Sequence, residues 1–107
     1  MDRIVERGRL YDFYGELLTP HQREVYEAAV YDDLSLSEIA EKSGTTKQAV
    51  HDLIKRTTAS LSATEEQLHM IRRYDEVMGA VNELRACAGS DERTQALLTR
   101  IEEAMRS

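Results

Sequence analysis

Two short amphipathic segments on either side of a glycine constrain the fold of this chain more than any other feature of its sequence. The first segment carries a small residue, Ala40, where a second helix can cross closely, and Gly44 follows where the helical pattern ends. Thr46 then stands where a cap would begin the next helix. A small crossing residue, a turn glycine and a cap at this spacing are typical of a helix-turn-helix, which we predict over residues 35–56.

The start of this motif has a signal of its own. In the run Ser35-Leu36-Ser37-Glu38, the Ser35 hydroxyl can accept a hydrogen bond from the Glu38 amide, and the Glu38 carboxylate can accept one from the Ser35 amide. This capping box predicts where the first helix begins. The side chains that helical spacing predicts to face inward are Leu36, Ile39, Ala40, Ala49, Val50, Leu53 and Ile54.

The second helix of the motif would present a polar face to solvent. Residues near the start of such a helix enter the major groove, so Lys47, Gln48 and His51 are placed for base edges, and Lys55 and Arg56 for phosphates. The predicted nucleic-acid-binding residues are therefore Thr46, Lys47, Gln48, His51, Lys55 and Arg56. The same pattern fits a solvated face in a protein that binds no nucleic acid, and Asp52 in the exposed row weakens the case for binding.

The segments before the motif are also helical in pattern. Apolar residues recur on one face over residues 2–18, which predicts a first helix. A cap at Thr19, a proline at Pro20 and an amide at Gln22 predict the start of a second, and the chain is expected to turn over residues 31–34. A single proline and 32% charged residues favour helices over strands throughout, so we predict an all-α fold.

The segment 57–107 continues the helical pattern as a C-terminal extension. Its apolar series, at spacings that suit a partner helix, is Leu61, Leu68, Ile71, Met78, Val81 and Leu84. Gly89 marks a break, and Ser90 is predicted to cap a last helix. Because this series is longer than so small a chain can cover, we predict that these helices mediate dimerisation or partner binding, with a homodimer expected. Residues 1–107 are predicted to form a single domain.

The charge of the chain restricts where a nucleic acid could approach. The formal net charge of −6 argues against a broad basic surface. Residues 34–56 carry four basic and three acidic groups, whereas residues 1–33 and 57–107 are both net acidic. We therefore expect a polyanion to be tolerated only near the middle segment.

The sequence carries no sign of a membrane segment or of a catalytic site. No apolar run approaches the roughly 20 residues that a membrane span needs, so we expect a cytoplasmic protein. The single cysteine, Cys87, is expected to pack against a helix face. Because His21, His51 and His69 lie in separate segments without further ligands at metal spacing, no metal or cofactor is expected. No phosphate loop, nucleophile elbow or inward carboxylate pair is visible, so the chain is not expected to be an enzyme.

Several runs of the sequence occur together in a known combination. They are Leu10-Tyr11-Asp12-Phe13-Tyr14, Glu16-Leu17-Leu18-Thr19, Tyr31-Asp32-Asp33, the run from Ser35 to Glu41, Gln48-Ala49-Val50 and Ile54-Lys55-Arg56-Thr57. The combination resembles the YlxM family of small bacterial proteins and extends from about Leu10 to His69. Thr46 stands where that family usually has serine, and His51 where an aromatic residue is common.

The resemblance implies a fold and a role that the residues alone do not. The family is similar in its central part to region four of bacterial sigma factors, and it is linked by gene neighbourhood to the signal recognition particle GTPase and its receptor. A regulatory role in that targeting pathway is implied, with DNA, the particle's RNA, the GTPase or its receptor as partner. Two alternatives stay open: a sequence-specific DNA-binding transcriptional regulator, and a protein-interaction adaptor that uses the same fold.

Overall fold

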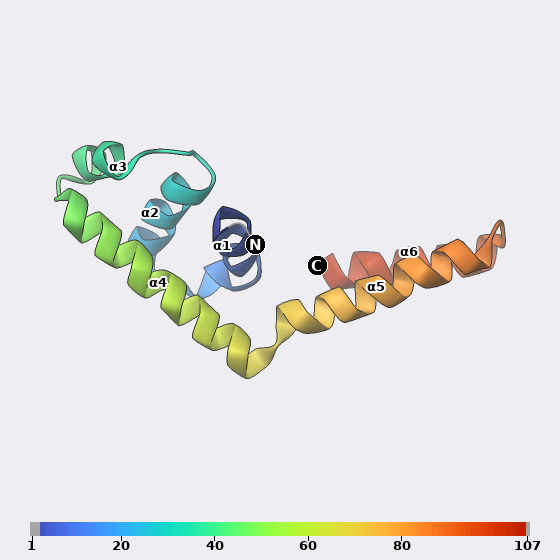
Figure 1. Cartoon of the computed structure of the whole chain (residues 1–107). Coiled ribbons are helices and arrows are strands. Elements are labelled where there is room, and N and C mark those ends of the chain that lie inside the picture. Colours follow the sequence, from blue (N-terminus) through green and yellow to red (C-terminus); the bar gives the residue numbers. More distant parts are fainter. Residues whose placement is uncertain (1–2, 107) are drawn as a thin grey trace. The chain divides into compact units, whose positions relative to one another are not determined.

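The computed structural model describes the backbone of residues 3–106 and the side chains of residues 6–106. Over this part of the chain it consists of six α-helices and one 3-10 helix, without a strand, which confirms the predicted all-α class (Figure 1). The helices form two compact units, an N-terminal unit (Met1–His69) and a C-terminal unit (Met70–Ser107). None of the described helices combines the length and the apolar character that a membrane crossing requires.

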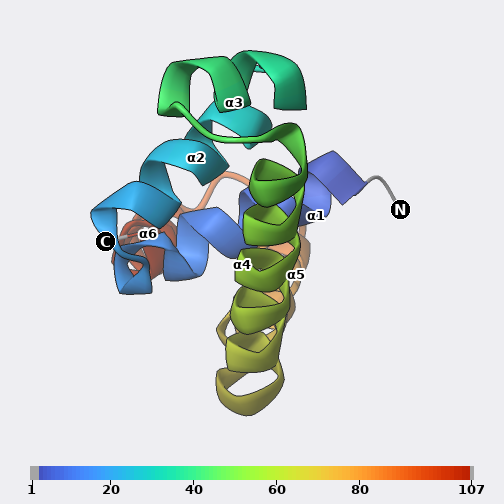
Figure 2. The ribbon, with the colours of Figure 1, turned by 90° about the vertical axis from the view of Figure 1, so that its left-hand side faces the viewer.

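The N-terminal unit holds the helix-turn-helix. Its elements are α1 (Arg3–Tyr14), the 3-10 helix η1 (Gly15–Leu17), α2 (Pro20–Val30), α3 (Leu36–Ser43) and α4 (Lys47–Leu68). Helices α1, α2 and α3 all pack on α4, and Figure 2 shows α2 and α3 beside the N-terminal end of α4. The long helix α4 is therefore the support on which the rest of the unit is assembled.

The start and stop signals predicted for these helices are confirmed. Thr19 and Ser35 each begin a helix with a complete capping box, and the Ser35 amide donates to Glu38 Oε1 at 3.1 Å. Gly44 ends α3 in the left-handed conformation, with φ 66° and ψ 34°, which a glycine adopts without a steric penalty. Thr46 Oγ1 accepts a hydrogen bond from the Ala49 amide at 3.1 Å and begins α4. All four signals act within one turn of helix, so local sequence is enough to specify them.

The core of the N-terminal unit is continuous across all four helices. Its buried apolar side chains are Leu10, Tyr11, Tyr14, Val25, Tyr26, Ile39, Ala40, Val50, Ile54 and Leu61. Tyr26 has no exposed surface, and its hydroxyl lies 2.9 Å from Thr58 Oγ1 on α4. Tyr14 donates to the Glu65 carboxylate further along α4. Ala40 is 6% exposed, which agrees with its predicted role as the small residue at a helix crossing.

Two predictions about the N-terminal unit need correction. The first helix ends at Tyr14 rather than Leu18, because Gly15, a poor helix former, begins the tighter turn of η1. Ala49 was predicted to face inward but is exposed. It lies one residue before the buried Val50, which places it at the edge of the inner face of α4. The predicted start at Asp2 lies outside the described residues.

Helix α4 continues without interruption through the segment rich in threonine and serine that follows Arg56. It ends at His69, whose φ of 56° is left-handed although the residue is not glycine. The amide of His69 donates to the Glu65 carbonyl at 2.7 Å, which closes the last turn. Residues 57–68 thus belong to the N-terminal unit, and the chain resumes as a helix at Met70.

The C-terminal unit is a hairpin of two antiparallel helices, α5 (Met70–Ala88) and α6 (Glu92–Arg106) (Figure 1). Arg85 on α5 donates to Gln95 Oε1 at 2.6 Å and pairs with the Glu102 carboxylate on α6. The residue before α6 is Asp91, not the predicted Ser90, and its carboxylate accepts from the Thr94 hydroxyl. Cys87 is exposed, so the prediction that it packs against a neighbouring helix is wrong.

Candidate nucleic-acid interface

The N-terminal half of α4 carries every residue that the sequence predicted for nucleic-acid contact. Burial of Val50 and Ile54 in the core fixes which face of the helix points away from the unit. The six predicted side chains are all exposed; they are the N-cap residue Thr46 and, within α4, Lys47, Gln48, His51, Lys55 and Arg56. The structure thus brings the six together on one helix, clear of the core.

Helical spacing arranges these side chains in a central row with two flanks. Gln48, His51 and Lys55 follow one another at three and four residues, so they share one stripe of the helix surface. Lys47 and Arg56 are separated by nine residues, which at about 100° per residue places them on opposite sides of that stripe. The stripe is therefore bordered by a cation on each side.

Asp52 lies within the same surface and engages the polar members of the row. Gln48 Nε2 donates to Asp52 Oδ1 at 3.0 Å. His51 Nδ1 lies 3.6 Å from the same oxygen and forms an ion pair when its ring is protonated. A side chain that reads a base edge needs its donors free. In this arrangement Asp52 occupies one N–H of the Gln48 amide, while the second N–H and Oε1 can still contact another group.

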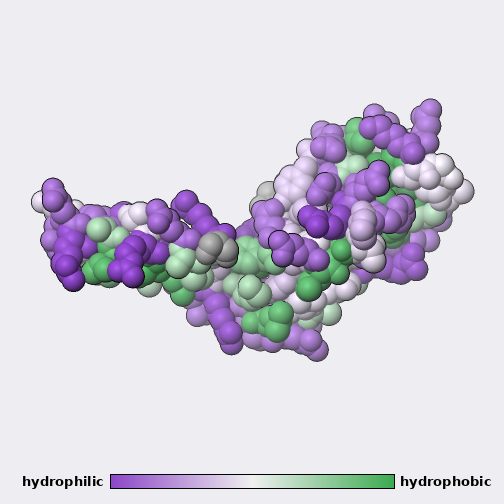
Figure 3. All heavy atoms as spheres, turned by 180° about the vertical axis from the view of Figure 1, so that it is seen from behind, coloured by the Kyte–Doolittle hydropathy of each residue, from purple (hydrophilic) through white to green (hydrophobic). Residues whose placement is uncertain are grey.

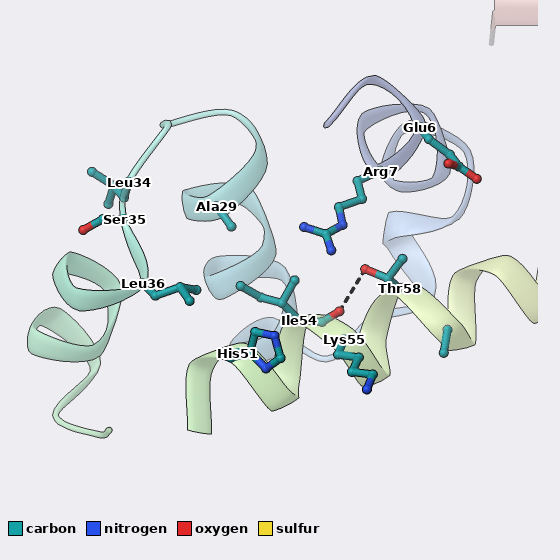
Figure 4. Close-up of a pocket in the computed structure, with 11 residues that line it drawn as sticks. Glu6, Arg7, Ala29, Leu34, Ser35, Leu36, His51, Ile54, Lys55 and Thr58 are labelled. Atoms are coloured by element: carbon teal, nitrogen blue, oxygen red, sulfur yellow. Dashed lines mark hydrogen bonds between the residues drawn. The ribbon is translucent and has the colours of Figure 1, made fainter. Parts of the chain in front are cut away.

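A groove runs along one side of the row, between α4, α1 and the start of α3. It encloses about 830 Å³, and its apolar floor includes Ala29, Leu36 and Ile54. Three basic side chains line it: Arg7 from α1, and His51 and Lys55 from α4 (Figure 4). Figure 4 shows that Arg7 extends from α1 toward α4. Since Glu6 is the one acidic residue in this lining, the groove adds positive charge beside Lys55.

Near Arg7, two hydroxyl groups connect α2 and α4. Thr58 Oγ1 donates to the Ile54 carbonyl at 2.8 Å and lies 2.9 Å from the Tyr26 hydroxyl. Burial raises the pKa of Tyr26, while the hydrogen bond with Thr58 and the charge of Arg7 act in the opposite direction. Arg7 is thus close enough to influence a core hydroxyl, although it is only half-buried.

A smaller hollow of about 210 Å³ lies on the other side of the row. Arg56 lines it, together with Ala49 and Leu53 from α4 and His21 from α2. Ala49 is therefore exposed but lines a hollow. Of the two flanking cations, Arg56 therefore lies beside a hollow.

Sequence reasoning missed Arg7, which the structure places beside the predicted residues. Residues 7 and 55 are far apart in sequence, and only the packing of α1 on α4 brings them to one groove. No local pattern around Arg7 distinguishes it from the other charged residues of the first helix. Within the described residues, no three histidine, cysteine or acidic side chains are grouped so as to hold a metal ion.

Comparison with known proteins relates the whole chain to one family. A model of the UPF0122 family, described as "Putative helix-turn-helix protein, YlxM / p13 like", matches residues 1–105. A UPF0122 protein of Thermoanaerobacter sp. (strain X514) is 42% identical over 76 residues, which are 71% of this chain and 65% of that protein, slightly less than two thirds of its length. A UPF0122 protein of Shouchella clausii (strain KSM-K16) is 37% identical over 105 residues, 95% of this chain and 96% of the relative. One from Geobacillus kaustophilus (strain HTA426) is 36% identical over 107 residues, 96% and 97%.

Proposed function

The chain belongs to the YlxM / p13-like helix-turn-helix family, and we propose that it is a non-enzymatic regulatory protein that contacts a nucleic-acid duplex with the N-terminal half of α4. The observation that carries this proposal is the exposed row of Gln48, His51 and Lys55, bordered by Lys47 and Arg56. Their positions near the start of the second helix of the motif are those from which side chains reach base edges. Arg7 adds a further cation beside the row.

We take DNA as the duplex that this surface fits. The major groove of B-form DNA is wide enough for an α-helix, whereas the major groove of A-form RNA is deep and narrow. A helix that carries its polar residues on one convex stripe therefore suits DNA better than the double-stranded part of the particle's RNA. Binding to the particle's RNA is therefore measured alongside binding to DNA.

The contact is expected to be weak and to depend modestly on salt. Lys47, Lys55 and Arg56 would each neutralise about one phosphate, which corresponds to a slope of log affinity against log salt of about −3 on duplex DNA. The net charge of −6 opposes any wider contact with a polyanion. Affinity at physiological salt is therefore modest.

The proposal is tested by measuring binding of the full chain to duplex DNA and to the particle's RNA by fluorescence anisotropy. Replacing Lys55 and Arg56 together by alanine is expected to weaken binding to every sequence and to reduce the slope by about two, since two phosphate contacts are lost. Lys42→Ala, on the exposed end of α3, is the matched control and is expected to change neither quantity. If wild type, the double variant and Lys42→Ala bind equally well, α4 is not the nucleic-acid contact.

Two further variants separate base reading from charge. Gln48→Ala is expected to alter the preference between DNA sequences, because an amide side chain reads adenine edges. Asp52→Asn removes a negative charge from the row and leaves Gln48 with a neutral, weaker acceptor, so it is expected to raise affinity severalfold for all sequences. A loss of affinity on Asp52→Asn would mean that the carboxylate itself contacts the ligand.

A second candidate is an adaptor for the signal recognition particle GTPase or its receptor in the cytoplasm. It is supported by the resemblance to the YlxM family and by the exposed apolar side chains of α5 and α6, which are more typical of a protein-binding surface than of a nucleic-acid contact. In a pull-down of the purified GTPase or receptor, this role predicts binding that survives alanine at Lys55 and Arg56. Binding to the GTPase with no binding to DNA or RNA would leave α4 as a scaffold.

A further inference from the structure

The C-terminal unit is too small to be a stable domain by itself. Chains of fewer than about 40 residues usually need disulfides, metals or oligomerisation to remain folded. In this unit, among the described residues, only Val81 and Leu98 are buried apolar side chains, one on each helix. Larger side chains with a substantial exposed surface include Met70, Val77, Leu84, Leu97 and Ile101. Figure 3 shows apolar atoms exposed along this unit, at the left of the picture.

These exposed side chains follow the spacing of a helix that packs against another helix. On α5 the exposed row is Met70, Arg73, Val77, Ala80, Leu84 and Cys87, which alternates steps of three and four residues. On α6 the row is Leu97, Ile101 and Ala104, again at steps of four and three. Alternating steps of three and four are those of the a and d positions in coiled coils and helical bundles. Arg73 is the one charged member.

Both rows lie on the same face of the hairpin. On each helix the exposed row precedes the inward-facing residues by one position, as Val77 precedes Met78 and Leu97 precedes Leu98. Two antiparallel helices that pack side by side are related by a two-fold axis perpendicular to the plane that contains both helix axes. Residues one position before the inward-facing ones therefore lie on the same side of that plane in both helices. We call this side the apolar face. The residues one position after the inward-facing ones, such as Asn82 and Thr99, give the opposite face a polar character.

The two edges of the apolar face carry opposite charges. One position before the row on α5 lie Arg72, Glu76 and Glu83, so this edge carries two carboxylates and one guanidinium and is net acidic; we call it the acidic edge. On α6 the charged residues at the equivalent positions are Arg100 and Glu103, and Arg93 lies seven residues before Arg100 on the same stripe, so this edge is net basic; we call it the basic edge. These are the flanking positions at which charged side chains select the partner of a helix and its orientation. A surface that is acidic along one edge and basic along the other is complementary to a copy of itself.

We propose that the apolar face binds the same face of a second copy of this chain, so that the two hairpins form an antiparallel four-helix bundle. With the two-fold axis parallel to the helices, α5 of one copy faces α6 of the other, and the acidic edge meets the basic edge on both sides. The alternative axis, perpendicular to the helices, would bring each helix against its own copy and place like charges together. The charges therefore select the first arrangement, which does not depend on nucleic-acid binding by α4.

The experiment is sedimentation equilibrium of the full chain at micromolar concentrations. A dimer of twice the 12.2 kDa chain mass is expected, and a 12.2 kDa species alone would overturn the proposal. Leu84→Glu, at a position that is 52% exposed within the hairpin, is expected to abolish dimerisation. Asn82→Glu, on the polar face of the same helix, is the matched control and is expected to leave it unchanged.

Charge reversal keeps the test decisive even if a single variant unfolds the hairpin. Reversing the acidic edge (Glu76→Arg with Glu83→Arg), or the basic edge (Arg93→Glu with Arg100→Glu), is expected to weaken self-association by about 10- to 100-fold, because like charges then face each other. An equimolar mixture of the two variants is expected to regain wild-type association as a heterodimer. Failure of the mixture to associate, while wild type dimerises, would overturn the proposed pairing of α5 with α6.

Discussion

The two units of this chain bury apolar side chains in different ways. In the N-terminal unit, α1, α2, α3 and α4 all contribute buried residues to one core, in which Tyr26 has no exposed surface. In the C-terminal unit, α5 and α6 bury Val81 and Leu98 and leave Val77, Leu84, Leu97 and Ile101 substantially exposed. A similar helical pattern of apolar residues in the sequence therefore leads to a closed core in one unit and to exposed apolar side chains in the other.

The largest expected effect distinguishes buried from exposed leucines on the same helix. Leu61 is 1% exposed in the core, and Leu61→Ala is expected to lower the free energy of unfolding by about 2–5 kcal/mol. Leu68, one helical repeat further along α4, is 47% exposed, and Leu68→Ala is expected to change it by less than about 1 kcal/mol. Urea denaturation of both variants measures the difference. Equal losses in the free energy of unfolding would mean that Leu68 is as deeply buried as Leu61, in contradiction to the structure.

The next effect compares two glycines, one in each unit. Gly44 adopts a left-handed conformation at the end of α3, so Gly44→Ala is expected to destabilise the N-terminal unit by about 1–2 kcal/mol. Gly79 lies in the interior of α5, and a Cβ built there meets nothing within 4 Å. Gly79→Ala is expected to stabilise α5 by about 0.5–1 kcal/mol, because alanine is the better helix former. Thermal melts followed by circular dichroism should move in opposite directions, and a shift of the same sign would contradict the helix assignments.

A pH dependence is expected from the capping box of α3. The hydrogen bond from the Ser35 amide, followed by that of its side chain, lowers the pKa of Glu38 below the ordinary value. A depressed pKa means that the contribution to stability is present at neutral pH and is lost as the pH falls through the folded-state pKa. Wild type is therefore expected to lose more stability between pH 7 and pH 3 than Glu38→Gln does, as measured by urea midpoints. Glu41→Gln, which removes a negative charge from the same helix, is the matched control, and an identical response of both variants would refute the capping role.

The same capping box can be tested at constant pH. Ser35→Ala removes the hydroxyl that accepts from the Glu38 amide at 3.1 Å and is expected to cost about 0.5–2 kcal/mol. Because this cap belongs to the N-terminal unit, the loss should appear in the melting of α1 to α4. A measured cost near zero would indicate that solvent replaces the hydroxyl at this helix end.

The smallest effect concerns a buried hydroxyl within α4. Among the described side chains, Thr57 Oγ1 is the buried polar atom without a hydrogen-bond partner. Thr57→Val keeps the shape and removes the unsatisfied group, so it is expected to stabilise the N-terminal unit by up to about 1 kcal/mol. The neighbouring Thr58→Val is the matched control, since it breaks the hydrogen bond to the Ile54 carbonyl and loses the contact with Tyr26. Stabilisation by both changes would contradict the assigned hydrogen bonds.

Sequence alone predicted the features that depend on neighbouring residues. The caps at Thr19, Ser35 and Thr46 and the glycine at Gly44 act within a single turn, and all were predicted at the correct positions. The end of α4 at His69 was not predicted, because a histidine in the left-handed conformation carries no turn signal of the kind that glycine or proline provides.

The features that sequence could not provide depend on tertiary packing. The exposure of Ala49 follows from how α4 is rolled against α1 and α2, and the position of Arg7 beside Lys55 follows from the crossing of α1 over α4. The apolar series after Leu61 was visible as one pattern. The sequence did not show which members of this series lie in the core of the N-terminal unit and which lie in the C-terminal unit.

Hydrogen exchange of the full chain over a hundredfold range of protein concentration tests the contrast between the units most directly. The N-terminal unit closes its own core, so protection of amides in α2 and α4 is expected to be independent of concentration. The C-terminal unit is proposed to gain its stability from a second copy, so protection in α5 and α6 is expected to rise with concentration until the dimer is saturated. Protection of α5 and α6 that is high and constant at all concentrations, down to those at which sedimentation shows a monomer, would contradict the account.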